Sequence, residues 1–437
     1  MLLVAATFLM GGSARDDVWS LLVLRPLTAV IFIAALMLCL PEAWRQARGL
    51  TIVGGCLLLL PLLHLIPLPP AVWTALPGRA VAVDVYHAMG MPLPWHALSL
   101  TPQHSWSAFF FLLAPLSACL LAITLPAAQL RQVLSAVLLL ALLSGLLGCM
   151  QLVGLSFYPY AITNEGSAVG LFANRNHAAL LLACLLPLLA LYVRTTSRRR
   201  RNLHFIRVMA LGGGVLVIPM ILMTGSRAGL ICAALAIPMA LWIYGRDSSG
   251  SDTDNRTMKL VSVFALLAAL CLGALFFFHS RAPALARLYE MSADTDLRWR
   301  VAPAIWRAAH DYFPWGSGIG SFVEIYRLYE PHELLGSHYL NHAHNDWLEL
   351  LLTGGLPAIL LLIGAIAVLL YRAAGGLTSQ HGKAQPWVRA GLSIVALFAV
   401  ASLVDYPVRT PALSVLLALA VAFAARWPSP RPALDKA

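Results

Sequence analysis

The chain has 437 residues, of which 60% are hydrophobic and only 11% are charged, and its mean hydropathy is +0.78. Soluble domains are roughly 45–50% apolar and about 25% charged, so this chain has too few charged groups to cover a water-facing surface. The composition excludes a soluble enzyme, a disordered chain and a fibrous protein. Long apolar runs such as residues 260–278 do not alternate as barrel strands would, so we expect an all-α integral membrane protein.

The formal net charge is +11, and 27 of the 30 basic residues are arginine. Such a charge would suggest nucleic acid as a partner of a soluble protein. In a membrane protein, the positive charge first indicates which loops are cytoplasmic, and we expect no nucleic-acid partner. The seven cysteines lie in or beside apolar runs without CxxC spacing, which favours packing roles over a disulfide framework or a zinc site.

A membrane span needs about 20 mostly apolar residues, and about twelve segments qualify, the first of them short. They are residues 1–13, 19–40, 50–66, 105–125, 132–152, 177–193, 206–224, 228–245, 260–279, 347–371, 388–404 and 411–426. Cytoplasmic loops carry the excess of Lys and Arg. The run Arg198–Arg201 and all three lysines fall on the cytoplasmic side if both termini are cytoplasmic. We therefore expect a single polytopic domain, residues 1–437, with this orientation.

The same topology leaves three long external segments, residues 67–104, 153–176 and 280–346. The first is rich in Pro and Trp, which suits the membrane interface. The third is the longest, and the pattern of residues 302–310 indicates that it is folded. Long loops of this kind are commonly functional.

Arginine gathers at the external ends of the predicted spans. Arg227 lies in a tight break between two spans, and Arg298 and Arg300 flank Trp299 in the third external segment. Arg175 follows Asn174 at the start of a span. The guanidinium fork matches phosphate oxygens, which points to a phosphate-bearing ligand. Snorkelling toward lipid headgroups is the alternative, and it explains Arg175 better than Arg227.

Two further external segments contain polar clusters. Residues 316–320 (GSGIG) lack the ending of a nucleotide-binding loop, so we expect a turn that lets backbone approach a neighbour. Asp405 and Arg409 lie four apart in the turn between the last two spans. They either pair with each other or place Asp405 as a carboxylate beside the other external groups.

The densest polar cluster is residues 341–346 (NHAHND), directly before a span. Asp346 and Glu349 have the spacing of a capping box, and Asn345 is a second candidate cap. Capping does not require two histidines. Histidine suits proton transfer near neutrality, and we expect this role for His344, while His342 is open between catalysis and structure. A His-x-His metal site would need a third ligand that the neighbourhood does not supply, so no metal is expected.

These motifs together resemble the O-antigen ligase and polymerase superfamily of membrane glycosyltransferases, most clearly over residues 165–410. The resemblance rests on residues 170–174 (GLFAN), 225–227 (GSR), 313–322 (FPWGSGIGSF) and 342–346 (HAHND). In the family's ligases, a His followed by Asn, Ser or Gln is separated by nine residues from a Gly, as His344-Asn345 is from Gly355 here. Ala358 stands where those ligases carry Gly, Thr or Tyr.

The resemblance implies about twelve spans in a GT-C-like fold, with a large periplasmic loop between the ninth and tenth, here residues 280–346. It implies transfer of a glycan from undecaprenyl diphosphate to a sugar hydroxyl at the periplasmic face of the bacterial inner membrane, with no metal or other cofactor. His344 would be the general base, and Arg227 with Arg298 or Arg300 would stabilise the diphosphate. His342, Asn345, Asp346, Asp405, Arg409 and Asn174 would support them.

Several functions remain open at this point. The acceptor is lipid A–core in a ligase or a growing polysaccharide in an O-antigen or exopolysaccharide polymerase, and a protein oligosaccharyltransferase uses the same chemistry. A transporter or flippase is the outside alternative. Transporters place ionisable residues near the bilayer midplane, whereas here these residues gather at external span ends, which favours an enzyme.

Overall fold

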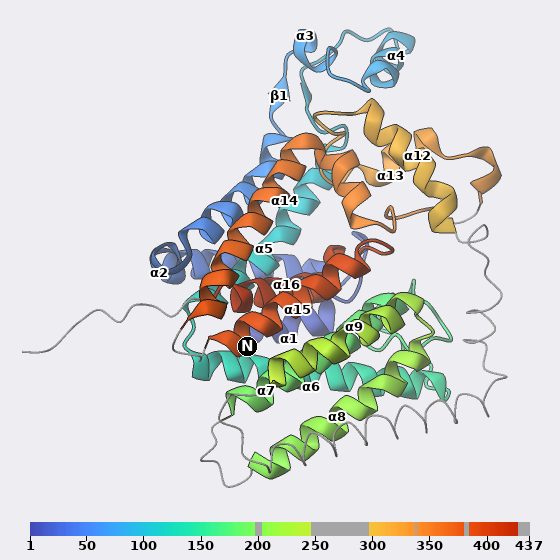
Figure 1. Ribbon diagram of the computed structural model, residues 1–437. Helices are drawn as coiled ribbons and strands as arrows, with labels where there is room; N and C mark the ends of the chain where they lie inside the picture. Colours follow the sequence, from blue (N-terminus) through green and yellow to red (C-terminus); the bar gives the residue numbers. More distant parts are fainter. Residues whose placement is uncertain (197–202, 246–296, 337–338, 380–383, 427–437) are drawn as a thin grey trace, which may run out of the picture.

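The computed structural model describes residues 1–196, 203–245, 297–336, 339–379 and 384–426 (Figure 1). These residues form an almost entirely helical protein, with one two-residue antiparallel strand pair. Within these residues, seven helices are long and apolar enough to cross a membrane. The chain is thus a multi-pass membrane protein of the expected all-α class. The predicted ninth span, residues 260–279, and the arginine run 198–201 lie outside the described residues.

The chain begins with α1 (Leu2–Met10), followed by α2 (Leu21–Leu63), α5 (Pro102–Thr124) and α6 (Ala127–Leu152). With 9 residues, α1 is too short to be a full span. The expected loop at residues 41–49 between two spans is wrong, because these residues are helical and belong to α2. The 43-residue helix instead breaks at Ala47, whose φ of −147° is not helical. Its two halves replace the two predicted spans.

The bundle continues with α7 (Arg175–Thr195), α8 (Leu203–Thr224), α9 (Arg227–Tyr244), α15 (Gln385–Ala401) and α16 (Pro411–Ala424). α7 packs against α6, α8, α9 and α15, and α16 packs against α5 and α15. α7 is apolar all round, as expected of a helix enclosed by others, and most of its side chains are buried. The main hydrophobic core therefore forms around α7 and α16.

A second group of elements lies at the top of Figure 1, away from α6 to α9. The first external segment supplies β1 (Pro67–Leu68), α3 (Pro70–Trp73), α4 (Ala80–Ala88) and β2 (His96–Ala97). The third supplies α12 (Leu297–Asp311), α13 (Phe322–Tyr329) and η2 (His332–Leu334). The described part of the third segment is folded, as predicted, on its own apolar cluster.

The glycine-rich turn joins these elements to α14 (Asp346–Thr378). Ser317 and Gly318 donate backbone hydrogen bonds to the carbonyls of Leu352 and Thr353 in α14. Gly318 has a φ of +114°, and a Cβ there would collide with Ser99. The expectation of close backbone approach is confirmed.

Candidate active site

Four helix N-termini meet at the turn between α15 and α16, and each is fixed by a polar contact. Asn174 caps α7 by accepting from Asn176 N at 2.8 Å, and Ser226 caps α9 by accepting from Gly229 N at 2.9 Å. Asn176 and Ser226 are themselves hydrogen bonded at 2.7 Å. Because helix N-termini carry partial positive charge and free N–H groups, this arrangement favours an anion nearby.

The other two N-termini belong to α14 and α16. Asn345 is the N-cap of α14, and its Oδ1 accepts from Leu348 N at 3.0 Å. Its amide also donates to the carbonyl of Leu403, which ties α14 to the end of α15. Thr410 precedes α16, and its hydroxyl lies 2.9 Å from His177 Nδ1. The predicted cap at Asn345 is confirmed.

The predicted capping box of Asp346 and Glu349 is wrong, because both carboxylates are used elsewhere. Asp346 accepts from Ser402 Oγ at 2.9 Å and from Arg409 Nε at 3.3 Å. Glu349 accepts from Ala343 N at 3.0 Å, and its two oxygens lie 3.1 and 3.2 Å from His342 Nδ1. These groups form a buried ionic network that holds the loop before α14 against the turn after α15.

The suggested pairing of Asp405 with Arg409 is also wrong. Arg409, at the end of η3 (Pro407–Arg409), reaches Asp346 and lies 3.5 Å from Glu349. Burial lowers the pKa of Arg409, but the two carboxylates raise it by more. Asp405 faces the opposite way, toward His344 and His177. The two residues thus serve separate networks.

Asp405 lies between two imidazoles. Its Oδ1 is 3.5 Å from His344 Nδ1 and 3.9 Å from His177 Nε2, and neither nitrogen has a hydrogen-bond partner among the described residues. Asn174 donates to its other oxygen at 3.4 Å. Burial raises the pKa of Asp405, but the imidazoles of His344 and His177 lower it by more. The pKa of this carboxyl group therefore lies well below its usual range. Asp405 is thus ionised beside His344.

His344 has an unusual backbone conformation. Its φ is +51°, and it is the one non-glycine residue with positive φ in the described parts of the chain. This conformation costs roughly 1–2 kcal/mol for a residue with a Cβ, and such strain is typical of functional sites. It aims the half-exposed imidazole at Asp405 while Asn345 starts the helix.

The Tyr406 ring contacts three histidines. Its centroid lies 4.5 Å from that of His342, 4.9 Å from His344 and 5.1 Å from His177. Burial and the Asp405 charge raise the pKa of Tyr406, so it remains a neutral spacer. His342 reaches the N-terminal segment, where its Nε2 lies 3.3 Å from the Ala14 carbonyl. His342 and His344 therefore face different carboxylates.

The predicted arginines are placed unequally. Arg298 lies at the start of α12, close enough that its charge lowers the pKa of Asp405. Arg227 is the first residue of α9, directly after the cap at Ser226. Arg300 is exposed on α12, and no described contact brings it to Asp405. Among the described side chains, no group of three or more His, Cys, Asp and Glu residues could hold a metal ion.

Sequence reasoning missed His177, Tyr406 and the ionic role of Glu349. His177 lies just inside a predicted span, and an ionisable residue there is a functional signal. Tyr406 adjoins Asp405, but nothing local distinguishes it.

Comparison with known families bears on these residues. Residues 212–363 match the family model described as O-antigen ligase. The matched range includes Arg227, Arg298, His342 and His344, whereas Asp405 and His177 lie outside it. No curated protein matches the chain. The match covers about a third of the chain, and it supports membership in the O-antigen ligase and polymerase superfamily.

Proposed function

We propose that this protein transfers a glycan from undecaprenyl diphosphate to a sugar hydroxyl at the periplasmic face of the bacterial inner membrane. The match of residues 212–363 to the O-antigen ligase family supports this reaction class. The observation that carries the assignment to this site is the Asp405 carboxylate between His344 and His177, where four helix N-termini meet. Both termini of the chain are then cytoplasmic, and residues 280–346 form the periplasmic loop.

His344 is the proposed general base. Because Asp405 faces Nδ1, it favours the tautomer with its proton on Nδ1 and leaves Nε2 free to accept a proton. The acceptor hydroxyl gives its proton to Nε2 as its oxygen bonds to the anomeric carbon of the donor. The bond from that carbon to the diphosphate breaks, and undecaprenyl diphosphate leaves. In-line attack inverts the anomeric centre, and base catalysis of this kind contributes typically 10²–10⁴-fold.

The leaving diphosphate requires positive charge beside the anomeric carbon. We assign this role to Arg227 and Arg298, with Arg300 as the alternative contact on α12, and to the helix N-termini. Arginine donates two parallel hydrogen bonds to phosphate oxygens, and stabilisation of developing charge is commonly the largest catalytic contribution. Asn174, Asn345, His342, Asp346 and Arg409 support the site through the contacts described above. Residues 165–410 contain all of these groups.

We propose a ligase that uses lipid A–core or a similar acceptor. A polymerase that extends lipid-linked repeats or an exopolysaccharide would use the same residues, because only the acceptor differs. A transporter remains the distant alternative.

The test is deletion of the gene in its host and complementation with wild type, His344→Ala or Asp405→Asn, followed by a lipopolysaccharide gel. His87→Ala, an exposed histidine in α4, is the matched control. We expect His344→Ala to lose all core-linked polymer and Asp405→Asn to lose activity roughly 10²-fold or more, with His87→Ala unaffected.

The gel also separates the acceptors. Core that carries a single repeat would indicate a polymerase, and an unchanged ladder with lost secreted polysaccharide would indicate an exopolysaccharide enzyme. Full activity of His344→Ala at normal protein levels would overturn the mechanism for every acceptor.

A further inference from the structure

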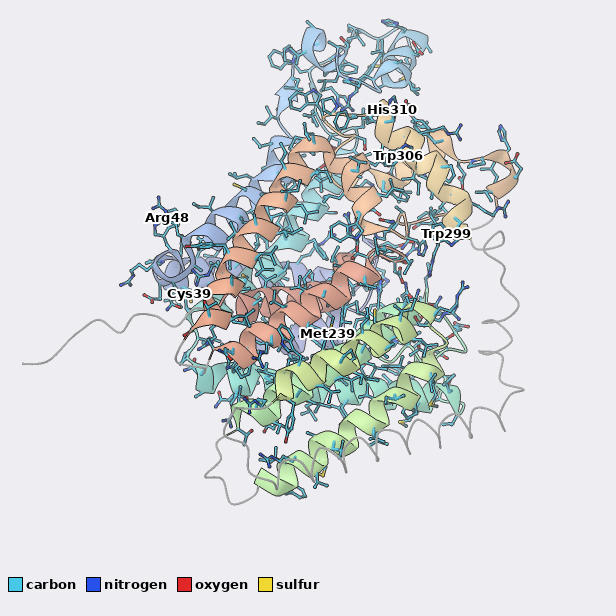
Figure 2. The ribbon with its side chains drawn as sticks, viewed as in Figure 1. Cys39, Arg48, Met239, Trp299, Trp306 and His310 are labelled. Carbon is cyan, nitrogen blue, oxygen red and sulfur yellow. The ribbon has the colours of Figure 1, made fainter. Side chains whose placement is uncertain are left out.

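One face of α12 displays aromatic side chains that the proposed reaction does not use. Trp299 and Trp306 are 62% and 61% exposed, and Figure 2 labels both along this helix, with Trp299 toward its lower end. Together with exposed Pro303, they follow the spacing of a single helical face. Arg307 lies beside Trp306 on the exposed surface. Exposed aromatic groups held in a row generally mark an interaction surface.

The opposite face of α12 holds the helix rigidly. Val301, Ala304, Ile305 and Ala308 are buried in the cluster that α12 shares with α13 and with the start of α14. The two tryptophans are therefore presented on a fixed support. Little conformational entropy would be lost in α12 on binding a ligand.

The composition of this face distinguishes it from a lipid-binding surface. Over residues 298–311 of α12, where the structure describes the side chains, the exposed residues are Trp, Arg, Pro, His and Asp, with no Leu, Ile, Val or Met among them. By contrast, α4 exposes Val81 and Val85, and the residue directly after it, Met89, is exposed four positions further on. Aliphatic groups on one helix face are what an interfacial helix inserts among acyl chains. α4 has this character, whereas α12 combines flat aromatic rings with hydrogen-bond donors.

The aromatic row also begins next to the candidate site. Arg298, which precedes Trp299, lies close enough to influence Asp405. Trp306 lies seven positions after Trp299, which at 1.5 Å per residue is about 10 Å, or roughly two sugar units. A chain that leaves the site along α12 would meet one indole ring after the other.

We propose that the Trp299–Trp306 face of α12 binds the glycan chain of the lipid-linked donor beyond its first sugar. This inference rests on the proposed function and deepens it. The C–H face of a pyranose ring stacks on an indole ring, and Arg307 supplies hydrogen-bond donors for hydroxyl or acidic substituents. Repeated weak contacts of this kind bind a polymer without selecting one particular sugar.

The test uses full-length protein in proteoliposomes with two lipid-diphosphate donors, one that carries a single sugar and one that carries several repeats. For Trp306→Ala we expect the KM of the long donor to rise about tenfold, with kcat unchanged. The single-sugar donor does not reach Trp306 and keeps its KM. Trp306→Phe should restore most of the affinity. Trp95→Ala, an exposed tryptophan in the first external segment, is the matched control.

Equal loss with both donors would show that α12 anchors the protein to the membrane surface and would overturn the proposal, as would unchanged KM for the long donor. A separate measurement distinguishes failure of the proposed function. Lipid-free polysaccharide released from the host's lipopolysaccharide should bind His344→Ala protein and bind the His344→Ala, Trp306→Ala double variant about tenfold more weakly. Equal binding by the two proteins would refute the glycan surface whether or not transfer occurs.

Discussion

His342 and His344 are separated by one residue but lie in different environments. His342 faces the buried Glu349 carboxylate and the Ala14 carbonyl, so both ring nitrogens are in contact with acceptors. His344 faces Asp405 with one nitrogen only. A histidine with both nitrogens occupied is suited to structure, and one with a free nitrogen is suited to proton transfer. The geometry therefore favours a structural role for His342.

The pKa of His342 leads to a prediction about stability. Burial lowers this pKa, but Glu349 raises it by more, so the net value lies above 6.5. A group whose folded pKa is raised stabilises the fold below its unfolded pKa, and this contribution disappears as pH rises through the folded pKa. We expect the melting temperature of wild type in detergent to fall as pH increases above about 6.5, and this step to be absent in His342→Gln.

Thermal unfolding between pH 5.5 and 8.5 provides the measurement. His87→Gln, at an exposed position in α4, should keep the wild-type pH dependence. An identical slope in wild type and His342→Gln would contradict the assignment of the titrating group.

At the scale of elements, α14 shows how a sequence motif becomes geometry. Gly355, which nine residues separate from His344-Asn345, has a φ of +59° and a ψ of −155°, and it kinks the helix. A Cβ at Gly355 would collide with the Pro314 carbonyl. The kink lets the Leu356 N–H reach that carbonyl at 2.8 Å. The glycine of the motif thus docks α14 against the turn after α12.

Gly355→Ala should therefore destabilise the protein. The backbone conformation is nearly restricted to glycine and costs about 1–3 kcal/mol for other residues, and the clash adds to this cost. Gly364→Ala is the control in the same helix, because nothing lies within 4 Å of the added Cβ; alanine there should be neutral or stabilising by up to about 1 kcal/mol. Melting temperatures of the two variants check this, and similar values would contradict the role of the kink.

The predicted helix bounds are wrong where a polar segment is nevertheless helical. Residues 41–49 are polar enough to suggest a loop, yet they are helical up to and beyond the break at Ala47. Low hydropathy indicates only that residues lie outside the lipid core, and such residues can form a helical turn as well as a loop. The break lies where α2 packs against α14, with Ala47 and Leu369 in one buried cluster, and these contacts cannot be read from the local sequence.

At the scale of the whole molecule, the N-terminal segment connects distant parts of the site. Gly11 O accepts from Ala412 N at the start of α16, and Gly12 O accepts from Ala173 N just before α7. Gly12 N donates to the buried Tyr160 hydroxyl at 2.6 Å. The Ala14 carbonyl reaches His342. Residues 11–14 therefore form hydrogen bonds with three of the segments that surround Asp405.

Loss of one of these hydrogen bonds should destabilise the fold. Tyr160→Phe leaves the buried Gly12 N–H without its acceptor, which costs about 1–3 kcal/mol. Tyr158→Phe removes a hydroxyl that accepts from Gly166 N in an exposed setting, where water replaces it at little cost. We expect a lower melting temperature for Tyr160→Phe alone, and equal effects of the two variants would contradict this role.

The sequence by itself determined the membrane character, the helical class, the family resemblance and the residue types of the site. Apolar runs have few alternatives to membrane helices, and His344, Asp405 and Arg298 stand out as ionisable groups at helix ends. The tertiary structure decided which groups meet. Asp405 faces His344, 61 positions earlier in the chain, and His177, 228 positions earlier, rather than the adjacent Arg409. Such pairings depend on how α7, α14, α15 and α16 pack, because local spacing sets only contacts within a turn or a helix.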